Sequence, residues 1–216
     1  MNNKPILAFD CAAPGASISL RVDGQTVTHL LPQGRQAAEL VPVIDELMRD
    51  AALIYQDLGA LVTTVGPGSF TGVRIGLAAA HGFVLVAHTP LKTLTTLTAM
   101  AWHVAHTTAA PARFFVALRA GKGEVYAQAF RLEAHTPLPT GEIFLAPEAY
   151  QNWDAPCFSN MLAVDDPLYL AGPNTETLCA VADRLNQTSL AAALPLYIRP
   201  PDAVVPKQAA WLSGPG

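Results

Sequence analysis

GPGSFTGVRIG, residues 66 to 76, joins a buried strand to a long apolar helix and decides the fold of this chain. The strand is predicted at residues 60–65, a continuous apolar and β-branched run typical of a strand that is covered on both faces. The glycines and the proline at 66–68 end the strand, Ser69 is placed to cap a helix, and the helix is predicted over residues 71–87. Because this helix is apolar on nearly all sides, it has to be buried on more than one side.

The segments before this unit predict a small sheet followed by a helix. Runs of β-forming residues at Ile6–Phe9, Ala16–Val22 and Thr26–Leu31 predict three strands, and Asp23-Gly24 is a typical hairpin turn between the last two. Residues Gln36–Leu53 carry apolar side chains at helical spacing, which predicts an amphipathic helix. The first half of the chain therefore indicates an α/β protein.

The second half repeats this character more weakly. Helices are predicted over Leu94–Ala105 and from Asn174 to about Leu185, and strands over Arg113–Leu118, Glu124–Leu132 and Tyr169–Ala171. Helix-breaking residues at 107–111 separate the halves. We therefore expect one lobe of residues 1–108 and a smaller lobe of residues 109–216 that ends in a proline-rich tail.

The composition indicates a globular protein with a partner surface. Of the 216 residues, 51% are hydrophobic and only 14% are charged, so uncharged or apolar side chains cover part of the surface. The net charge of -4 argues against the chain holding a phosphate backbone by itself, because such binding uses clustered Lys and Arg. The cysteines match no metal or disulfide spacing, and the apolar runs are too short for a membrane span. We expect a cytoplasmic protein without membrane contact.

The glycine-rich loop is a candidate for a weak anion site. A strand that leads through glycines into a helix leaves free backbone N–H groups and the positive end of the helix dipole beside a crevice. The residues concerned are Gly66, Pro67, Gly68, Ser69, Phe70 and Thr71. Since neither a Walker motif nor a dinucleotide fingerprint is present, packing is the better interpretation of the glycines.

Small residues on the apolar helix predict a close approach by another backbone. Gly72, Gly76 and Ala80 recur at intervals of four residues and form one stripe. Such a helix has to be covered, either by elements of its own domain or by a second protein. We expect the two long helices to form a partner interface made of Leu40, Val43, Ile44, Leu47, Gly72, Gly76, Ala80 and Phe83.

No catalytic or metal site is predicted. Ser69 lacks the GxSxG context of a nucleophile and is better placed as a helix cap. His103 and His106 share a helix face, but no carboxylate or cysteine neighbours them in the sequence. Asp165-Asp166 precedes a proline and is typical of a solvated turn.

Five segments in order carry a resemblance to a known family. They are ILAFDCAAPGASISL, RQAAELVPVIDELM, GPGSFTGVRIGLAAAHGF, LRAGKGEVYAQAF and PLYIRP. Together they span nearly the whole chain, and GPGSFTG followed by RIG is the most specific of them. The sequence resembles the bacterial TsaB (YeaZ) proteins of the actin-like ATPase superfamily.

This resemblance implies two actin-like (ASKHA, ribonuclease H-like) α/β lobes with mixed sheets flanked by helices. It implies a noncatalytic subunit, not an enzyme, that pairs through its first two helices with TsaD. TsaD, with the ATPase TsaE, attaches threonylcarbamoyl to an adenosine beside the tRNA anticodon. The implied partners are a TsaD-like protein, a TsaE-like ATPase, a second copy when the chain is alone, and tRNA only through the complex. No cofactor is implied for the chain alone, and ATP or ADP only within the assembled complex.

The chain departs from the family pattern at three places. Cys11, Ala12 and Ala13 stand where relatives commonly carry hydroxyl residues, Gln36 replaces a frequent histidine, and Arg119 replaces a frequent aspartate. Each change removes a polar group that an ATPase would use, which favours the scaffold role. The alternatives are an independent kinase, ATPase or protease of the same superfamily, and a homodimeric binding module that works without TsaD.

Overall fold

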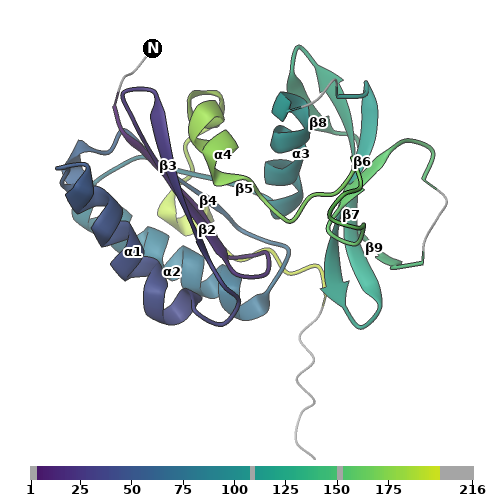
Figure 1. Ribbon diagram of the computed structural model, residues 1–216, viewed down its shortest axis with the longest axis horizontal. Coiled ribbons are helices and arrows are strands. Elements are labelled where there is room, and N and C mark those ends of the chain that lie inside the picture. Colours follow the sequence, from purple (N-terminus) through teal and green to yellow (C-terminus); the bar gives the residue numbers. More distant parts are fainter. Residues whose placement is uncertain (1–3, 108–109, 150–152, 200–216) are drawn as a thin grey trace, which may run out of the picture.

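Two five-stranded sheets, one in each lobe, organise the computed structural model, which describes residues 4–107, 110–149 and 153–199 (Figure 1). The first sheet contains β1 (Ile6–Asp10), β2 (Ala16–Val22), β3 (Gln25–Leu31), β4 (Ala60–Thr64) and β5 (Leu91–Leu94), in the order β3-β2-β1-β4-β5. The β1–β2 and β2–β3 pairs are antiparallel, whereas β1–β4 and β4–β5 are parallel. The sheet is therefore mixed, as expected.

Helices cover both faces of this sheet. The helices α1 (Gln36–Asp50) and α2 (Phe70–Ala87) lie on one face, and α3 (Thr96–Thr107) and α4 (Thr175–Val181) lie on the other (Figure 1). Alternate side chains of β1 point to opposite faces of the sheet: Leu7 and Phe9 pack with α1 and α2, and Ile6 and Ala8 pack with α4. Both faces are buried, which explains why the strand runs in the sequence are continuously apolar.

The second sheet contains β6 (Arg113–Gly121), β7 (Glu124–Glu133), β8 (Thr136–Pro139), β9 (Phe144–Pro147) and β10 (Cys157–Ser159). The order is β10-β6-β7-β8, and β9 pairs with β7. Helix α3 is shared by the two lobes, because Ala99 and Trp102 pack in the core of the first lobe while Leu97 and Met100 pack against the second sheet. The two lobes therefore have contiguous cores.

The chain returns to the first lobe near its C-terminus. Helix α4, with the one-turn helix η2 (Ala182–Arg184), packs on β1 and β2 of the first sheet, and Ala193, after the one-turn helix η3 (Leu190–Ala192), lies in its core. The prediction that all of residues 109–216 form the second lobe was therefore wrong for the segment from α4 to η3. The predicted boundary, residues 108 and 109, and the last part of the chain with its proline-rich tail, residues 200–216, lie outside the described residues.

The expectation that every apolar run is too short for a membrane span was wrong for α2, which is long and apolar enough by length and composition alone. Its inward side packs on β4 and β1 of the same chain, and 39% of it is buried. This packing is the arrangement of a core helix, so the apolar sequence of α2 is explained by the fold.

Candidate functional site

The glycine-rich segment packs against the loop that follows β1. A Cβ atom at Gly72 would lie 1.9 Å from the carbonyl oxygen of Cys11, and a Cβ at Gly68 would lie 2.2 Å from that of Ala12. The N–H of Ser69 donates to the carbonyl of Ala12 at 2.8 Å. The predicted close approach of two backbones is therefore present, and the approaching backbone belongs to the same chain.

The start of α2 uses two of its backbone N–H groups inside the chain. The Ser69 hydroxyl accepts the N–H of Gly72 at 3.1 Å, so the predicted helix cap is confirmed. The carbonyl of Ser69 accepts the N–H of Val73, and the N–H of Ser69 is itself bonded to the β1 loop. The N–H groups of Ser69 and Gly72 are therefore engaged inside the chain. The weak anion site at residues 66–71 stays a prediction.

Asp10, at the end of β1, is fully buried and holds its own loop. Its carboxylate accepts the N–H groups of Ala12 at 3.2 Å and Ala13 at 3.1 Å, and also the hydroxyl of Thr64. Burial raises the pKa of Asp10 above its ordinary value, and these three hydrogen bonds lower it by a smaller amount. The carboxylate thus has its partners within the chain and is turned away from the solvent.

Gln36 ties the start of α1 to the same region. Its side-chain amide donates to the carbonyl of Gly15 at 2.9 Å, and its amide oxygen accepts the N–H of Gly34 at 2.8 Å. The side chain is buried. The polar group at this position therefore fixes the turn between β3 and α1.

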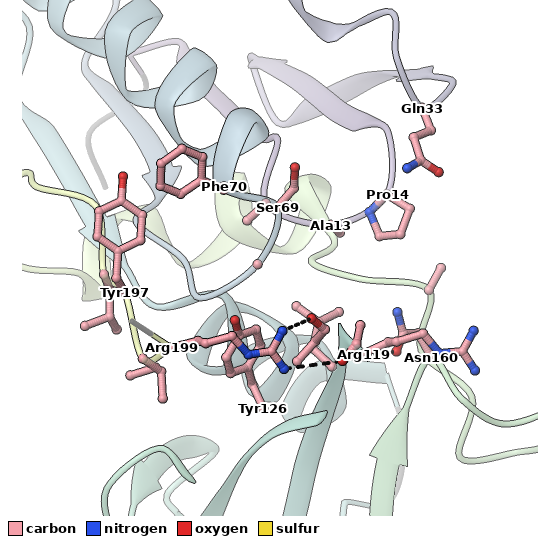
Figure 2. Close-up of a pocket in the computed structure, with 18 of the residues that line it drawn as sticks. Ala13, Pro14, Gln33, Ser69, Phe70, Arg119, Tyr126, Asn160, Tyr197 and Arg199 are labelled. Atoms are coloured by element: carbon pink, nitrogen blue, oxygen red, sulfur yellow. Dashed lines mark hydrogen bonds between the residues drawn. The ribbon is translucent and has the colours of Figure 1, made fainter. Parts of the chain in front are cut away.

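A cavity of about 1140 Å³ lies between the two lobes; we call it the interlobe cleft. Figure 2 shows Ser69, Ala13 and Pro14 on the side of the first lobe, and Tyr126 with Arg199 on the side of the second. Phe70 and Tyr197 lie toward one end of the cleft, and Arg119 and Asn160 lie toward the other. The lining combines aromatic rings, amides and guanidinium groups.

The segment after η3 bridges the two walls of this cleft. The N–H of Leu196 donates to the carbonyl of Val65 in the first lobe at 2.7 Å. Three residues later, Arg199 donates to the carbonyls of Ala120 and Gly121, both at 3.3 Å, and pairs with the carboxylate of Glu124 in the second lobe. We call residues 194–199 the strap.

Six of the eight predicted interface residues are buried inside the chain, and the other two are partly buried against the same core. Leu40, Ile44 and Leu47 of α1 and Gly72, Gly76 and Ala80 of α2 are buried, and Val43 packs against the same core. Phe83 is partly exposed and stacks on Tyr55 with a centroid distance of 4.8 Å. A side chain without exposed surface cannot contact a second protein in this conformation. Any docking surface on α1 and α2 must therefore use their outward residues.

Both histidines of α3 lie beside polar groups of the same chain, and burial affects all three cysteines. The ring of His103 lies 3.3 Å from the Thr177 hydroxyl, and that of His106 lies 3.0 Å from the carbonyl of Trp102. Among the described residues, no group of three His, Cys, Asp or Glu side chains could hold a metal ion. Cys11, Cys157 and Cys179 are free thiols, and burial raises the pKa of each.

Residues 33–197 match the family model described as TsaD, tRNA N6-adenosine threonylcarbamoyltransferase. Two relatives are the proteins named tRNA threonylcarbamoyladenosine biosynthesis protein TsaB from Haemophilus influenzae and Escherichia coli. The first is 37% identical over 103 residues, 47% of this chain and 43% of the relative. The second is 36% identical over 126 residues, 56% of this chain and 52% of the relative. The chain belongs to the TsaB (YeaZ) family, within the group that the TsaD model describes. The matched region spans about half the length of these relatives.

The fold agrees with a solved member of the family. YeaZ from Pseudomonas aeruginosa superimposes with a TM-score of 0.73 over 90% of this chain and 100% of its own, at 23% sequence identity. The predicted fold of two actin-like (ASKHA, ribonuclease H-like) lobes with mixed sheets is therefore confirmed. At this identity the likeness supports the fold and carries no statement about ligands.

Sequence reasoning missed most of the interlobe cleft. Arg74, Tyr197 and Arg199 line it but belong to segments more than a hundred residues apart. Arg119 was noted only as a departure from the family pattern. All five segments that carry the family resemblance supply residues to the lining, among them Gly68, Ser69 and Phe70 of the candidate anion loop and Tyr197 and Arg199 of PLYIRP.

Proposed function

We propose that this chain is a noncatalytic scaffold subunit of the machinery that synthesises N6-threonylcarbamoyladenosine in tRNA, and that it binds and activates a TsaD-like protein. One observation carries the proposal: the loop after β1 is closed on itself. The carboxylate of Asp10 is bonded to Ala12, Ala13 and Thr64, and the backbone of residues 11–12 is packed against Gly68 and Gly72. A loop whose polar groups are engaged in this way supports a structural role.

The outward sides of α1 and α2 are the proposed docking face for the TsaD-like protein. Large apolar side chains there are exposed: Val41 to 44%, Leu85 to 64% and Val86 to 62% of their surface. Ile54, in the loop after α1, is exposed to 63% and lies near the end of α2, since Gln56 of this loop donates to the carbonyl of Val86. Apolar side chains gathered on neighbouring elements are typical of a protein interface. We call these four residues the helical face.

The remaining features of the proposal follow the family. A TsaE-like ATPase would join the complex, and the tRNA would reach the chain only through the complex. A second copy of the chain would occupy the helical face when no TsaD-like protein is present. The chain alone would need no cofactor, and ATP or ADP would bind only in the assembled complex. All of this would take place in the cytoplasm, without membrane contact.

The test combines association with complementation. Leu85→Asp puts a charge on the helical face, whereas Val164→Asp makes the same change at a residue that is 79% exposed on the second lobe. We expect Leu85→Asp to weaken co-elution with the TsaD-like protein at least tenfold, because an unpaired charge would be desolvated in the interface. We expect Val164→Asp to bind as the wild type does.

In a strain that lacks the gene, the wild type and Val164→Asp should restore threonylcarbamoyladenosine in bulk tRNA, and Leu85→Asp should not. Equal binding and equal restoration by both variants would contradict the helical face as the docking surface. Calorimetry of the isolated chain with ATP and magnesium tests the kinase alternative. Micromolar binding accompanied by turnover would contradict the noncatalytic role.

A further inference from the structure

The charge of the interlobe cleft is opposite to that of the whole chain. The chain has a net charge of -4, yet three arginines and no aspartate or glutamate are among the described residues that line the cleft. The arginines are Arg74 from the first lobe, Arg119 from the second, and Arg199 from the strap. A concave surface with only positive charges in its lining favours an anionic ligand.

The three guanidinium groups differ in whether a carboxylate of the chain already pairs with them. Arg119 pairs with Glu148 at 3.1 Å, and Arg199 pairs with Glu124, but both carboxylates lie outside the lining. The structure gives no ion pair for Arg74 with any described carboxylate. Its Nε donates instead to the neutral hydroxyl of Tyr197 at 2.8 Å. Of the three arginines, Arg74 is therefore the one whose positive charge is least neutralised by a carboxylate.

Two aromatic rings hold Arg74 in place and are themselves half exposed. The guanidinium lies 3.7 Å from the centroid of the Phe70 ring, which in turn packs on Tyr197 at a centroid distance of 5.3 Å. Phe70 is 48% exposed and Tyr197 is 45% exposed, and Figure 2 shows both at the same end of the cleft. An exposed aromatic ring beside a fixed guanidinium is a suitable surface for a nucleobase and its phosphate.

We propose that the interlobe cleft receives one unpaired nucleotide of the tRNA, with its base on Phe70 and Tyr197 and its phosphate at Arg74. This inference rests on the proposed function, because the tRNA is brought to the chain by the complex. The ligand chemistry alone would also suit a free nucleotide. RNA is favoured because a nucleoside triphosphate binds with Mg²⁺, which prefers carboxylate ligands, and the cleft lining presents none. A nucleotide within an RNA strand brings a single phosphate and no metal.

The test measures binding of a fluorescein-labelled anticodon stem-loop RNA to the full chain assembled with its TsaD-like partner. Arg74→Gln should weaken binding about tenfold and reduce the slope of log Kd against log salt by about 0.7, the value for one phosphate contact on a single strand. Phe70→Ala should weaken binding by a factor of about 5 or more through lost stacking. Arg119→Gln, on the opposite wall, should weaken binding without any change in α2.

Arg113→Gln is the matched control, because Arg113 is an exposed arginine of the second lobe that does not line the cleft. Equal RNA affinities for Arg74→Gln, Arg119→Gln and Arg113→Gln would overturn the inference. Unlabelled AMP distinguishes the two sources of a nucleotide. AMP should compete with the RNA but bind more weakly, because it lacks the contacts of the rest of the strand; if AMP binds the cleft as tightly as the RNA does, the ligand is a free nucleotide and the proposal is wrong.

Assembly with the TsaD-like protein is followed separately by size exclusion. If Arg74→Gln and Arg119→Gln assemble normally and bind RNA normally, the inference fails and the proposed function stands. If the wild-type chain does not assemble with the TsaD-like protein at all, the proposed function fails first. The two failures are therefore distinguishable.

Discussion

Gly72 and Gly82 lie on the same helix, but Gly72 is tightly packed and Gly82 faces open space. A Cβ at Gly72 would meet the carbonyl oxygen of Cys11 at 1.9 Å, whereas a Cβ at Gly82 would meet nothing within 4 Å. We expect Gly72→Ala to destabilise the chain by ~3 kcal/mol, at the upper end of overpacking, because the obstacle is backbone. Gly82→Ala should stabilise it by about 0.5–1 kcal/mol, since alanine is the better residue inside a helix. Urea denaturation of both variants measures these differences.

The outcome separates two reasons for glycine in α2. If both variants were destabilised equally, the close contact between Gly72 and Cys11 could not be the reason, because Gly82 has no such contact. If Gly72→Ala were as stable as the wild type, the loop after β1 would have to be displaced without cost.

The sequence could predict the small stripe of α2 but not what covers it. The spacing of Gly72, Gly76 and Ala80 identifies a face on which a backbone can approach. Periodicity carries no information about which backbone arrives. The loop after β1 is more than fifty residues away in the sequence, and only the parallel pairing of β1 with β4 brings it there. The prediction of a partner on this stripe failed for that reason.

Asp10 gives a second prediction at this scale. Asn at position 10 keeps one acceptor oxygen, but its NH₂ group would face the N–H of Ala12 or Ala13, so Asp10→Asn should cost about 1–3 kcal/mol. Because burial raises the pKa of Asp10 above 3.8, the folded state holds the proton more tightly than the unfolded state. The advantage of the wild type over the variant is thus greatest below pH 3.8 and declines as the pH rises through the folded pKa. Urea denaturation from about pH 4 to about pH 8 checks this trend. A difference that grows with pH would contradict it.

At the scale of elements, the contact between α3 and α4 joins the two halves of the sequence. His103 of α3 lies beside Thr177 of α4, and burial lowers the pKa of His103 below 6.5, with the nearby His106 lowering it further and Glu176 opposing the shift. The folded state therefore disfavours the protonated ring. Stability from this group is present above pH 6.5 and is lost as the pH falls through the folded pKa.

His103→Asn removes this titration and leaves a polar side chain of smaller size. We expect the wild type to lose stability relative to the variant as the pH is lowered from about 7.5 to about 5.5. Thermal melting of both proteins across this range measures the effect. Parallel curves for the two proteins would show that His103 is equally easy to protonate in the folded and unfolded states.

Elements with strong periodicity were predicted well, and short irregular ones were not. Helices α1 and α2 begin within one residue of their predicted starts, because an amphipathic or apolar pattern of this length is unambiguous. Strands β8, β9 and β10 were missed, since each has only three or four residues and the first two contain prolines. The strand predicted at Tyr169–Ala171 is reduced to a single bridge between Ser159 and Tyr169.

At the scale of the whole molecule, the interlobe cleft exists because the chain crosses between lobes more than once. Its lining comes from the loop after β1, the start of α2, the β6–β7 turn, the segment after β10 and the strap. No local pattern in any one of these segments indicates that they meet. The sequence predicted two lobes but not the return of α4 and η3 to the first sheet. The strap can connect the two lobes only because the chain has returned to the first lobe before it.

The strap gives the prediction that belongs to this scale. The Arg199 side chain is only 19% exposed and links the strap to Ala120, Gly121 and Glu124 of the second lobe. We expect Arg199→Ala to lower the free energy of unfolding by about 1–3 kcal/mol, because it leaves partly buried carbonyl and carboxylate groups without a donor. It should also speed amide hydrogen exchange at Leu196, whose N–H is bonded to Val65 across the base of the strap.

Arg113→Ala is the matched control, since Arg113 and its partner Asp154 are 69% and 65% exposed and such pairs contribute little. Its stability should lie within about 0.5 kcal/mol of the wild type, with exchange at Leu196 unchanged. If Arg199→Ala lowered stability but left exchange at Leu196 as it was, the arginine would stabilise the β6–β7 turn alone. Lower stability together with faster exchange at Leu196 would show that the strap holds both lobes at once. The reason is that Arg199 is bonded to the second lobe, whereas the N–H of Leu196 is bonded to the first.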